Sequence, residues 1–320
     1  EYITVLEGIR EEAGDDVRIL YSQGCDLYKD KVENLAWDQD RISEAVITAE
    51  NSDVVILCVG LDETLEGEEG DTGNSDASGD KVDLHLPKVQ EELIEKVTAV
   101  GKPTIVVLMA GSAIDLNYAQ DNCNGILLAW YPGARGGRAI ADLLFGKESP
   151  SGKLPVTFYK DLEGMPEFTD YSMKNRTYRY MEKEALYPFG YGLTYSDTCV
   201  TEAEVVGEVS AESDIMLKAT VKNNGTVDTD EVVQVYIKDL DSPLAVRNYS
   251  LCGFKRVSLK AGEEKSVEFT ISNKAMNIVD EDGNRYIAGK HFRLFAGVSQ
   301  PDTRSAELTG HKPAEVEIAL

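Results

Sequence analysis

The sequence predicts two domains of different class, an α/β domain followed by an all-β sandwich. Three observations predict this arrangement. Helical and strand patterns alternate up to about residue 160, which is typical of a mostly parallel sheet with helices on both faces. From about residue 200 the apolar residues recur with a period of two, as in an antiparallel β-sandwich. The length of 320 residues suits two domains of ordinary size.

In the first half, apolar residues three and four positions apart predict helices, and uninterrupted apolar runs predict strands that are buried on both faces. Pro87 fits the first turn of a helix, and Gly146 is expected to stop the last one. The expected helices cover residues 5–13, 41–50, 87–100 and 134–145. The expected strands cover residues 17–21, 54–60, 104–109 and 125–130.

The second half shows clean alternation of apolar and polar residues. Strands are expected at residues 215–221, 233–237 and 267–271, with turn residues between them. The preceding stretch is rich in Tyr, Pro and Gly and has little periodicity, so we expect a linker that wraps over both domains. The predicted boundaries are 1–160 for the α/β domain, 161–198 for the linker and 199–320 for the sandwich.

Composition excludes several classes of function. The net charge is −25, and no cluster of Lys and Arg provides the basic surface that nucleic acid requires. The longest apolar runs, at 54–59 and 105–110, are too short to cross a bilayer. No charged region followed by an apolar stretch is visible at the N-terminus, so we expect a location in the bacterial cytoplasm. A targeting signal upstream of residue 1 would not be visible.

The five cysteines, at positions 25, 58, 123, 199 and 252, are odd in number and form no CxxC pair. Neither a zinc site nor a disulfide framework is indicated, and we expect reduced structural thiols. Cys58 lies inside an apolar run and is expected in the core. No metal ion and no cofactor is implied.

The most conspicuous polar stretch follows the strand expected at 54–60. Ligands of open parallel sheets bind beyond the carboxyl ends of the strands. Residues 60–86 form an unusually long connection that is almost free of apolar side chains, and such loops are often functional. Crowded carboxylates raise one another's pKa, as a general acid requires. From chemistry alone, a solvated acidic loop or a weak calcium loop is the favoured interpretation of the same residues.

Several runs, in order along nearly the whole chain, resemble the C-terminal part of family 3 glycoside hydrolases. The acidic loop carries GLDETLEGEE at 60–69, followed by DK at 80–81 and LHLPKVQ at 84–90. Further runs are AWYPG at 129–133, AIADLLFG at 139–146, PSGKLPVTF at 150–158, RTYRY at 176–180 and YPFGYGLTY at 187–195. In the sandwich, VKNNG at 221–225 and LCGFKRV at 251–257 are similar to the family's fibronectin-III-like domain.

The resemblance implies an α/β sandwich domain followed by an immunoglobulin-like, fibronectin-III-like domain. It also implies an N-terminal barrel, absent from this sequence, that carries a catalytic Asp nucleophile and is a partner of this chain. By motif position the acid/base role falls to Glu68, with Glu66 as the runner-up. The family's Asp-Arg pair is Asp80-Lys81 here, and lysine lacks the planar fork of arginine.

Other candidates have structural and functional interpretations. Trp130, Tyr131 and Arg135 follow the end of a strand, where they would bind sugar by stacking or, as we favour, form a structural turn packed against the neighbouring domain. His85 alternates with leucines and is expected to be structural. The tyrosines between 178 and 195 line a cleft or, as we favour, fasten the domains together.

The resulting hypothesis is part of a retaining β-glycosidase that removes glucose or xylose from non-reducing ends. The chain would supply the acid/base loop and be inactive without the nucleophile. The alternative hypothesis is a non-catalytic module that binds carbohydrate or a partner chain. The acidic loop resembles xylosidase-type members somewhat more than the others.

Overall fold

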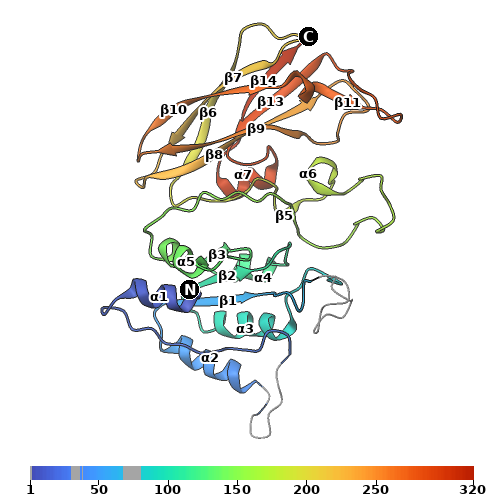
Figure 1. Cartoon of the computed structure of the whole chain (residues 1–320). Coiled ribbons are helices and arrows are strands. Elements are labelled where there is room, and N and C mark those ends of the chain that lie inside the picture. Colours follow the sequence, from blue (N-terminus) through green and yellow to red (C-terminus); the bar gives the residue numbers. More distant parts are fainter. Residues whose placement is uncertain (1, 30–36, 38, 68–80) are drawn as a thin grey trace. The chain divides into compact units, whose positions relative to one another are not determined.

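The computed structural model describes residues 2–29, 37, 39–67 and 81–320 (Figure 1). The chain forms two compact units. Unit 1 contains Glu1–Lys147 and Lys160–Leu162, and unit 2 contains Glu148–Tyr159 and Glu163–Leu320. The fold class is confirmed, because unit 1 holds a parallel sheet with helices and unit 2 holds antiparallel sheets. The domain boundaries at 160 and 198 stay predictions.

The sheet of unit 1 has three parallel strands in the order β1-β2-β3. They are β1 (Val55–Gly60), β2 (Thr104–Met109) and β3 (Gly125–Leu128). In β2, the side chains of Val106, Val107 and Leu108 are completely buried, as expected for a strand between two helical layers. The predicted strand at 125–130 ends early, because Trp130 adopts a φ of 52° that no extended strand allows.

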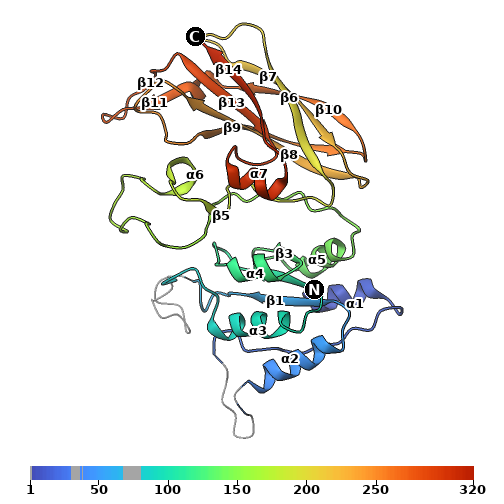
Figure 2. The same cartoon turned by 180° about the vertical axis from the view of Figure 1, so that it is seen from behind.

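The helices of unit 1 lie on both sides of β1. They are α1 (Val5–Ala13), α2 (Asp40–Glu50), α3 (Lys88–Thr98), α4 (Asn117–Asn122) and α5 (Gly136–Leu144). In both views α2 and α3 lie below β1 and α5 lies above it (Figure 1 and Figure 2). α1 packs against α5, and α2 packs against α3. A capping box between Thr4 and Glu7 begins α1 where the sequence predicts a helix.

The prediction that residues 17–21 form a strand of the sheet is wrong. Residues 18–24 have no regular secondary structure, and in the part of the chain that the structure describes β1 pairs with β2 alone. The prediction that Cys58 lies in the core is also wrong, because its side chain is exposed although it lies in the middle of β1. None of the five cysteines, all of which are described, forms a disulfide in the structure.

Unit 2 contains a β-sandwich. Its sheets have the orders β10-β7-β6 and β14-β13-β8-β9, and every pairing is antiparallel. The strands of the sandwich are β6 (Thr198–Val206), β7 (Ile215–Asn223), β8 (Thr229–Asp239), β9 (Ser250–Leu259), β10 (Glu264–Ile271), β13 (His291–Gly297) and β14 (Ala314–Ala319). The inward residues alternate along β7 and β10, which explains their period of two.

Short elements complete unit 2. They are β4 (Phe158–Tyr159), α6 (Thr177–Tyr180), β5 (Ala185–Tyr187), the 3-10 turn Asn273–Met276, β11 (Asn277–Val279), β12 (Arg285–Ile287) and α7 (Thr303–Thr309). Among the described residues, none of the helices has the length and apolar content that crossing a membrane requires.

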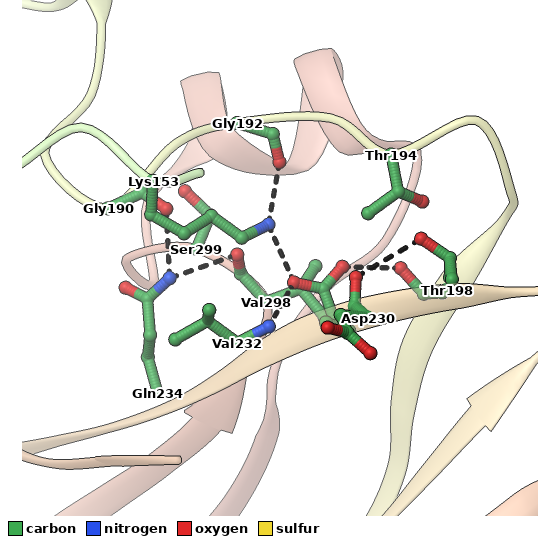
Figure 3. A network of polar contacts seen from close by, with 12 residues as sticks. Lys153, Gly190, Gly192, Thr194, Thr198, Asp230, Val232, Gln234, Val298 and Ser299 are labelled. Atoms are coloured by element: carbon green, nitrogen blue, oxygen red, sulfur yellow. Dashed lines mark hydrogen bonds and ion pairs between the residues drawn. The ribbon is translucent and has the colours of Figure 1, made fainter. Parts of the chain in front are cut away.

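A buried polar network ties Lys153 and Gly192 to β8 within unit 2 (Figure 3). The Lys153 ammonium lies 2.8 Å from the Glu231 carboxylate and donates a hydrogen bond of 2.6 Å to the Gly192 carbonyl. Glu231 also accepts hydrogen bonds from Thr198 and the backbone of Val232. The side chains of Lys153 and Glu231 are only 9% and 2% exposed, so each charge depends on the other.

Candidate active site

The acidic loop begins at the carboxyl end of β1, where open parallel sheets bind their ligands. Gly60 packs so closely on β2 that a Cβ atom there would lie 1.9 Å from the Met109 carbonyl oxygen. The side chain of Gln90 binds both the N–H and the C=O of Gly60, at 2.7 and 2.8 Å. The start of the loop is therefore fixed from both sides.

A single helical turn follows. The N–H groups of Leu65 and Glu66 donate to the Asp62 carbonyl at 3.0 and 2.9 Å. The Asp62 carboxylate accepts hydrogen bonds from the backbone and hydroxyl of Thr64. Leu65 is buried, so the turn packs into unit 1 and directs Glu66 to one side.

Glu66 is bound to the ends of two neighbouring strands. Its Oε2 atom accepts a hydrogen bond of 2.9 Å from the N–H of Gly111, just beyond β2. The same oxygen accepts a hydrogen bond of 2.6 Å from the hydroxyl of Tyr131, just beyond β3. Gly111 leaves room for this arrangement, because a Cβ atom there would lie 2.8 Å from the Tyr131 ring. The loop is thus anchored across the carboxyl edge of the sheet.

These contacts hold Glu66 in its ionised form. Burial alone raises the pKa of the Glu66 carboxyl, but the nearby Ser112 hydroxyl, hydrogen bonds from Tyr131 and Gly111 and the charge of Lys81 outweigh it, so the pKa lies below its ordinary value. Burial and the bond to Glu66 raise the pKa of Tyr131, which stays protonated and donates. A carboxylate in this state accepts hydrogen bonds and is a poor proton donor at neutral pH.

Lys81 lies where the sequence departs from the family's Asp-Arg pair. Its ammonium donates a hydrogen bond of 2.7 Å to the Ala113 carbonyl, in the same segment that binds Glu66. Burial lowers the pKa of Lys81, while the negative charges of Glu66 and Asp83 oppose that shift. Its partner Asp80 lies outside the described residues, as does Glu68, the acid/base residue that the motif predicts.

The three candidates beyond β3, which are Trp130, Tyr131 and Arg135, have different surroundings. Tyr131 binds Glu66 and is still 49% exposed. Trp130 holds a positive φ of 52°, which is unusual for a bulky side chain and typical of functional sites. Arg135 is exposed and forms the N-cap of α5, four residues beyond Tyr131. Sequence reasoning predicted Tyr131 as a sugar-stacking or turn residue and missed its bond to Glu66.

The remaining candidates make contacts within their own units, and the expectation that the tyrosines between 178 and 195 fasten the two domains together stays a prediction. His85 contacts Glu91 at 2.8 Å, and that hydrogen bond raises the pKa of the imidazole. Tyr178 stacks on Phe189 with ring centroids 4.3 Å apart, and its hydroxyl accepts a hydrogen bond from the N–H of Leu251. Within the described ranges, no group of His, Cys, Asp and Glu is arranged to hold a metal ion.

Two family models match the chain. The "Glycosyl hydrolase family 3 C-terminal domain" matches residues 1–195, and the "Fibronectin type III-like domain" matches residues 231–300. The first match contains the acidic loop, the strand ends that bind Glu66, and the segment that carries Lys153.

Relatives of named activity are similar over most of the chain. A β-xylosidase of Formosa agariphila is 34% identical over 316 residues, which cover 96% of this chain and 42% of that protein. A xylan 1,4-β-xylosidase of Xylanibacter ruminicola is 39% identical over 270 residues, 83% of this chain and 31% of that protein. A periplasmic β-glucosidase of Salmonella typhimurium is 30% identical over 92% of this chain and 41% of its own length.

Solved structures agree with this similarity. A β-glucosidase from Erythrobacter marinus superimposes on all of this chain with a TM-score of 0.82 and 30% identity, and the match covers 43% of that protein. A β-glucosidase from Bifidobacterium adolescentis superimposes with a TM-score of 0.81 and 28% identity, over 45% of its length. The chain therefore spans less than half the length of the relatives that it matches.

Proposed function

The chain belongs to glycosyl hydrolase family 3, and we propose that it forms the acid/base half of a retaining β-glycosidase. The observation that carries this proposal is the anchoring of the acidic loop by Glu66 at the carboxyl edge of the sheet. A loop fixed at that edge can present a neighbouring carboxyl group to a sugar bound there. The second carboxyl group would come from a barrel domain of the whole protein.

Glu68 is the proposed acid/base residue. The motif position favours it over Glu66, and the surroundings of Glu66 add an independent argument. Hydrogen bonds and a nearby lysine keep Glu66 ionised, whereas an acid catalyst must carry a proton when the substrate binds. In this assignment Glu66 is a positioning residue, which fixes the loop two residues before Glu68.

The proposed mechanism has two steps. A carboxylate of the barrel attacks the anomeric carbon while Glu68 protonates the oxygen of the leaving group, so that the glycosidic bond breaks and a glycosyl-enzyme forms. Glu68 then removes a proton from water, which attacks the anomeric carbon and releases the sugar and the barrel carboxylate. The two carboxyl groups should lie roughly 5 Å apart.

The proposed substrates are β-linked xylosides and glucosides with a free non-reducing end. The support is that similar proteins carry the names β-xylosidase and β-glucosidase. Trp130 and the exposed part of Tyr131 are proposed to contact the sugar, with Arg135 at the rim. Nitrophenyl β-xyloside, β-glucoside and α-arabinofuranoside, hydrolysed by the whole protein, would rank the substrates, and we expect the β-xyloside to be preferred.

Azide rescue tests the acid/base assignment. In the whole protein, Glu68→Ala should lower kcat on an aryl β-glycoside by about 10²–10⁴-fold, the usual contribution of a general acid. Azide should restore turnover and give the β-glycosyl azide, because the small anion replaces water without needing a base. Glu66→Ala is the matched variant, and it should lose activity without rescue.

Two results would remove the role from Glu68. One is unchanged activity of Glu68→Ala, and the other is rescue that occurs only with Glu66→Ala. The 320-residue chain alone should show no appreciable turnover. Clear hydrolysis by the chain alone would show that both carboxyl groups lie within it.

A further inference from the structure

The acidic loop is held at both of its described ends by one short segment, residues 111–115, which follows β2. At the near end, Glu66 accepts a hydrogen bond of 2.9 Å from the first N–H group of this segment. At the far end, residues 81–85, the Leu84 carbonyl accepts a hydrogen bond of 2.6 Å from the N–H of Asp115. A change in the hold on the far end therefore acts on the support that also fixes Glu66.

His85 brings a positive charge to this far end. Its Nδ1 atom lies 2.8 Å from the Glu91 carboxylate of α3 and 3.9 Å from the carboxylate of Asp115. The backbone N–H of His85 also donates a hydrogen bond of 2.9 Å to the carboxylate of Asp83. The imidazole therefore lies among three carboxylates, one from α3, one from residues 111–115 and one from the loop end itself.

The proton of His85 decides whether these carboxylates are compensated. The hydrogen bond to Glu91 raises the pKa of the imidazole above its ordinary value of 6.5, burial opposes this shift, and the charges of Glu91, Asp115 and Asp83 add to it. Since the folded pKa is raised, the attraction is complete at lower pH and is lost as pH rises through the folded pKa. Above that pH the three carboxylates repel one another with no cation between them. The far end is then held less tightly against residues 111–115.

The size of this effect is limited by exposure and by a second contact. The side chain of His85 is 55% exposed, so water and salt screen its charge. Lys81 donates a hydrogen bond of 2.7 Å to the Ala113 carbonyl, next to the completely buried Ile114, and this contact does not involve His85. Loss of the proton should therefore loosen the far end without releasing it.

We infer that His85 is a positioning residue of the proposed reaction, which as an imidazolium holds the far end of the acidic loop against residues 111–115. The inference rests on the proposed acid/base role of this loop. A general acid must lie within hydrogen-bond distance of the leaving oxygen, so a loosened loop should protonate that oxygen more slowly. The rate should therefore depend on the charge of His85 only for leaving groups that need a proton.

Amide hydrogen exchange tests the hold in the 320-residue chain, where no substrate is needed. The protection factor of the Asp115 amide, which corrects for the pH dependence of free-amide exchange, should fall about two- to fivefold between about pH 6 and about pH 9. In His85→Gln it should have the lower value at both pH values, and in His85→Lys, which keeps its charge, the higher value. The Leu61 amide, which donates to Met109, is the internal control and should not respond. Protection of Asp115 that is equal in all three proteins at both pH values would overturn the inference.

The dependence of kcat/KM on the leaving group tests the positioning role in the whole protein. At about pH 6, His85→Gln should lower kcat/KM about two- to fivefold for aryl β-xylosides of weakly acidic phenols and leave it unchanged for acidic phenols. At about pH 9 it should equal the unaltered enzyme with both, and His85→Lys should exceed both proteins with the weakly acidic phenols. A residue with a merely structural role would lower kcat/KM with both kinds of phenol at every pH. That result, or no loss at all, would overturn the inference.

His291→Gln is the matched control. It removes another exposed histidine, which lies 3.0 Å from the Asp241 carboxylate in unit 2, and it should change neither kcat/KM nor the protection of Asp115. An effect equal to that of His85→Gln would assign the pH dependence to the net charge of the protein and overturn the inference. Failure of the acid/base assignment is recognised separately, because it shows as unchanged activity of Glu68→Ala and leaves the exchange of Asp115 as it is.

Discussion

Glu66 is the residue whose surroundings define the candidate site. One of its oxygens accepts hydrogen bonds from the ends of two strands, and Lys81 lies close enough to favour its negative charge. Carboxylates held in this way usually position other groups, because their proton is lost well below neutral pH. The two glutamates of the loop motif therefore have separate roles in the proposed mechanism, Glu66 as anchor and Glu68 as acid.

Replacement of Glu66 by glutamine should lower the stability of unit 1 in a pH-dependent way. The pKa of Glu66 in the folded protein is below its ordinary value of 4.5, so its contribution is fully present above that pH and is lost as pH falls through the folded pKa. At pH 7 Glu66→Gln should lower the free energy of unfolding by about 1–2 kcal/mol. Near pH 3 the difference should shrink.

Urea unfolding followed by tryptophan fluorescence would measure this effect, since both tryptophans, Trp37 and Trp130, lie in unit 1. Glu63→Gln is the control, because Glu63 is exposed on the same turn. A stability difference for Glu66→Gln that stays constant from pH 7 to pH 3 would contradict the ionised state assigned to it.

At the scale of single elements, close helix packing in unit 1 depends on two glycines. A Cβ atom at Gly8 of α1 would lie 2.2 Å from the carbonyl oxygen of Gly137 in α5. Gly137 in turn packs on Thr4, where a Cβ atom would lie 2.0 Å from the carbonyl oxygen. α1 therefore contacts α5 backbone to backbone.

Gly8→Ala should lower the free energy of unfolding of unit 1 by about 1–3 kcal/mol, because overpacking forces two backbones apart. Gly133→Ala is the matched control, since no atom lies within 4 Å of a Cβ atom there. Tryptophan fluorescence during urea unfolding separates the two variants. Equal stability of Gly8→Ala and Gly133→Ala would show that α1 and α5 can move apart without lowering the free energy of unfolding.

The buried pair of Lys153 and Glu231 fastens the segment before the sandwich to β8. Lys153→Met should lower the free energy of unfolding of unit 2 by about 3–5 kcal/mol, because Glu231 is left charged and buried without its partner. Lys265→Met breaks the pair with Glu263, whose side chains are more exposed, at 41% and 30%, and should change stability by no more than about 1 kcal/mol.

Far-ultraviolet circular dichroism would follow this transition, because unit 2 contains no tryptophan. A second variant, Lys153→Met combined with Glu231→Gln, should recover part of the loss, since the uncompensated charge is removed. A loss from Lys153→Met no larger than that from Lys265→Met would show that water reaches the pair.

On the scale of the whole molecule, most of the elements could be predicted from the sequence. Strands such as β2 are continuous apolar runs that are buried on both faces, and the sandwich strands alternate with a period of two. That residues 17–21 join no sheet among the described residues could not be predicted, because a local pattern does not show which strands pair. The exposure of Cys58 could not be predicted either, because an apolar run does not show which side chains of a strand are covered.

The candidate site was predictable only in part. The acidic loop and Tyr131 stand out in the sequence, but the hydrogen bond between Glu66 and Tyr131 joins residues 65 positions apart, which no local pattern reports.

Outside the candidate site, Glu231 had a visible signal that was overlooked. It occupies an inward position of β8, two residues before Val233, where a charged side chain requires a buried partner.

The dependence of the reaction on the leaving group tests the central claim, that Glu68 of this chain is the acid/base residue, most directly. The whole protein and its Glu68→Ala variant would be assayed on aryl β-xylosides whose phenols range from acidic to weakly acidic. Acidic phenols leave without protonation, so the variant should form the glycosyl-enzyme nearly as fast as the unaltered enzyme with them and about 10²–10⁴-fold more slowly with weakly acidic phenols. An equal loss across the whole series, or no loss at all, would contradict the claim.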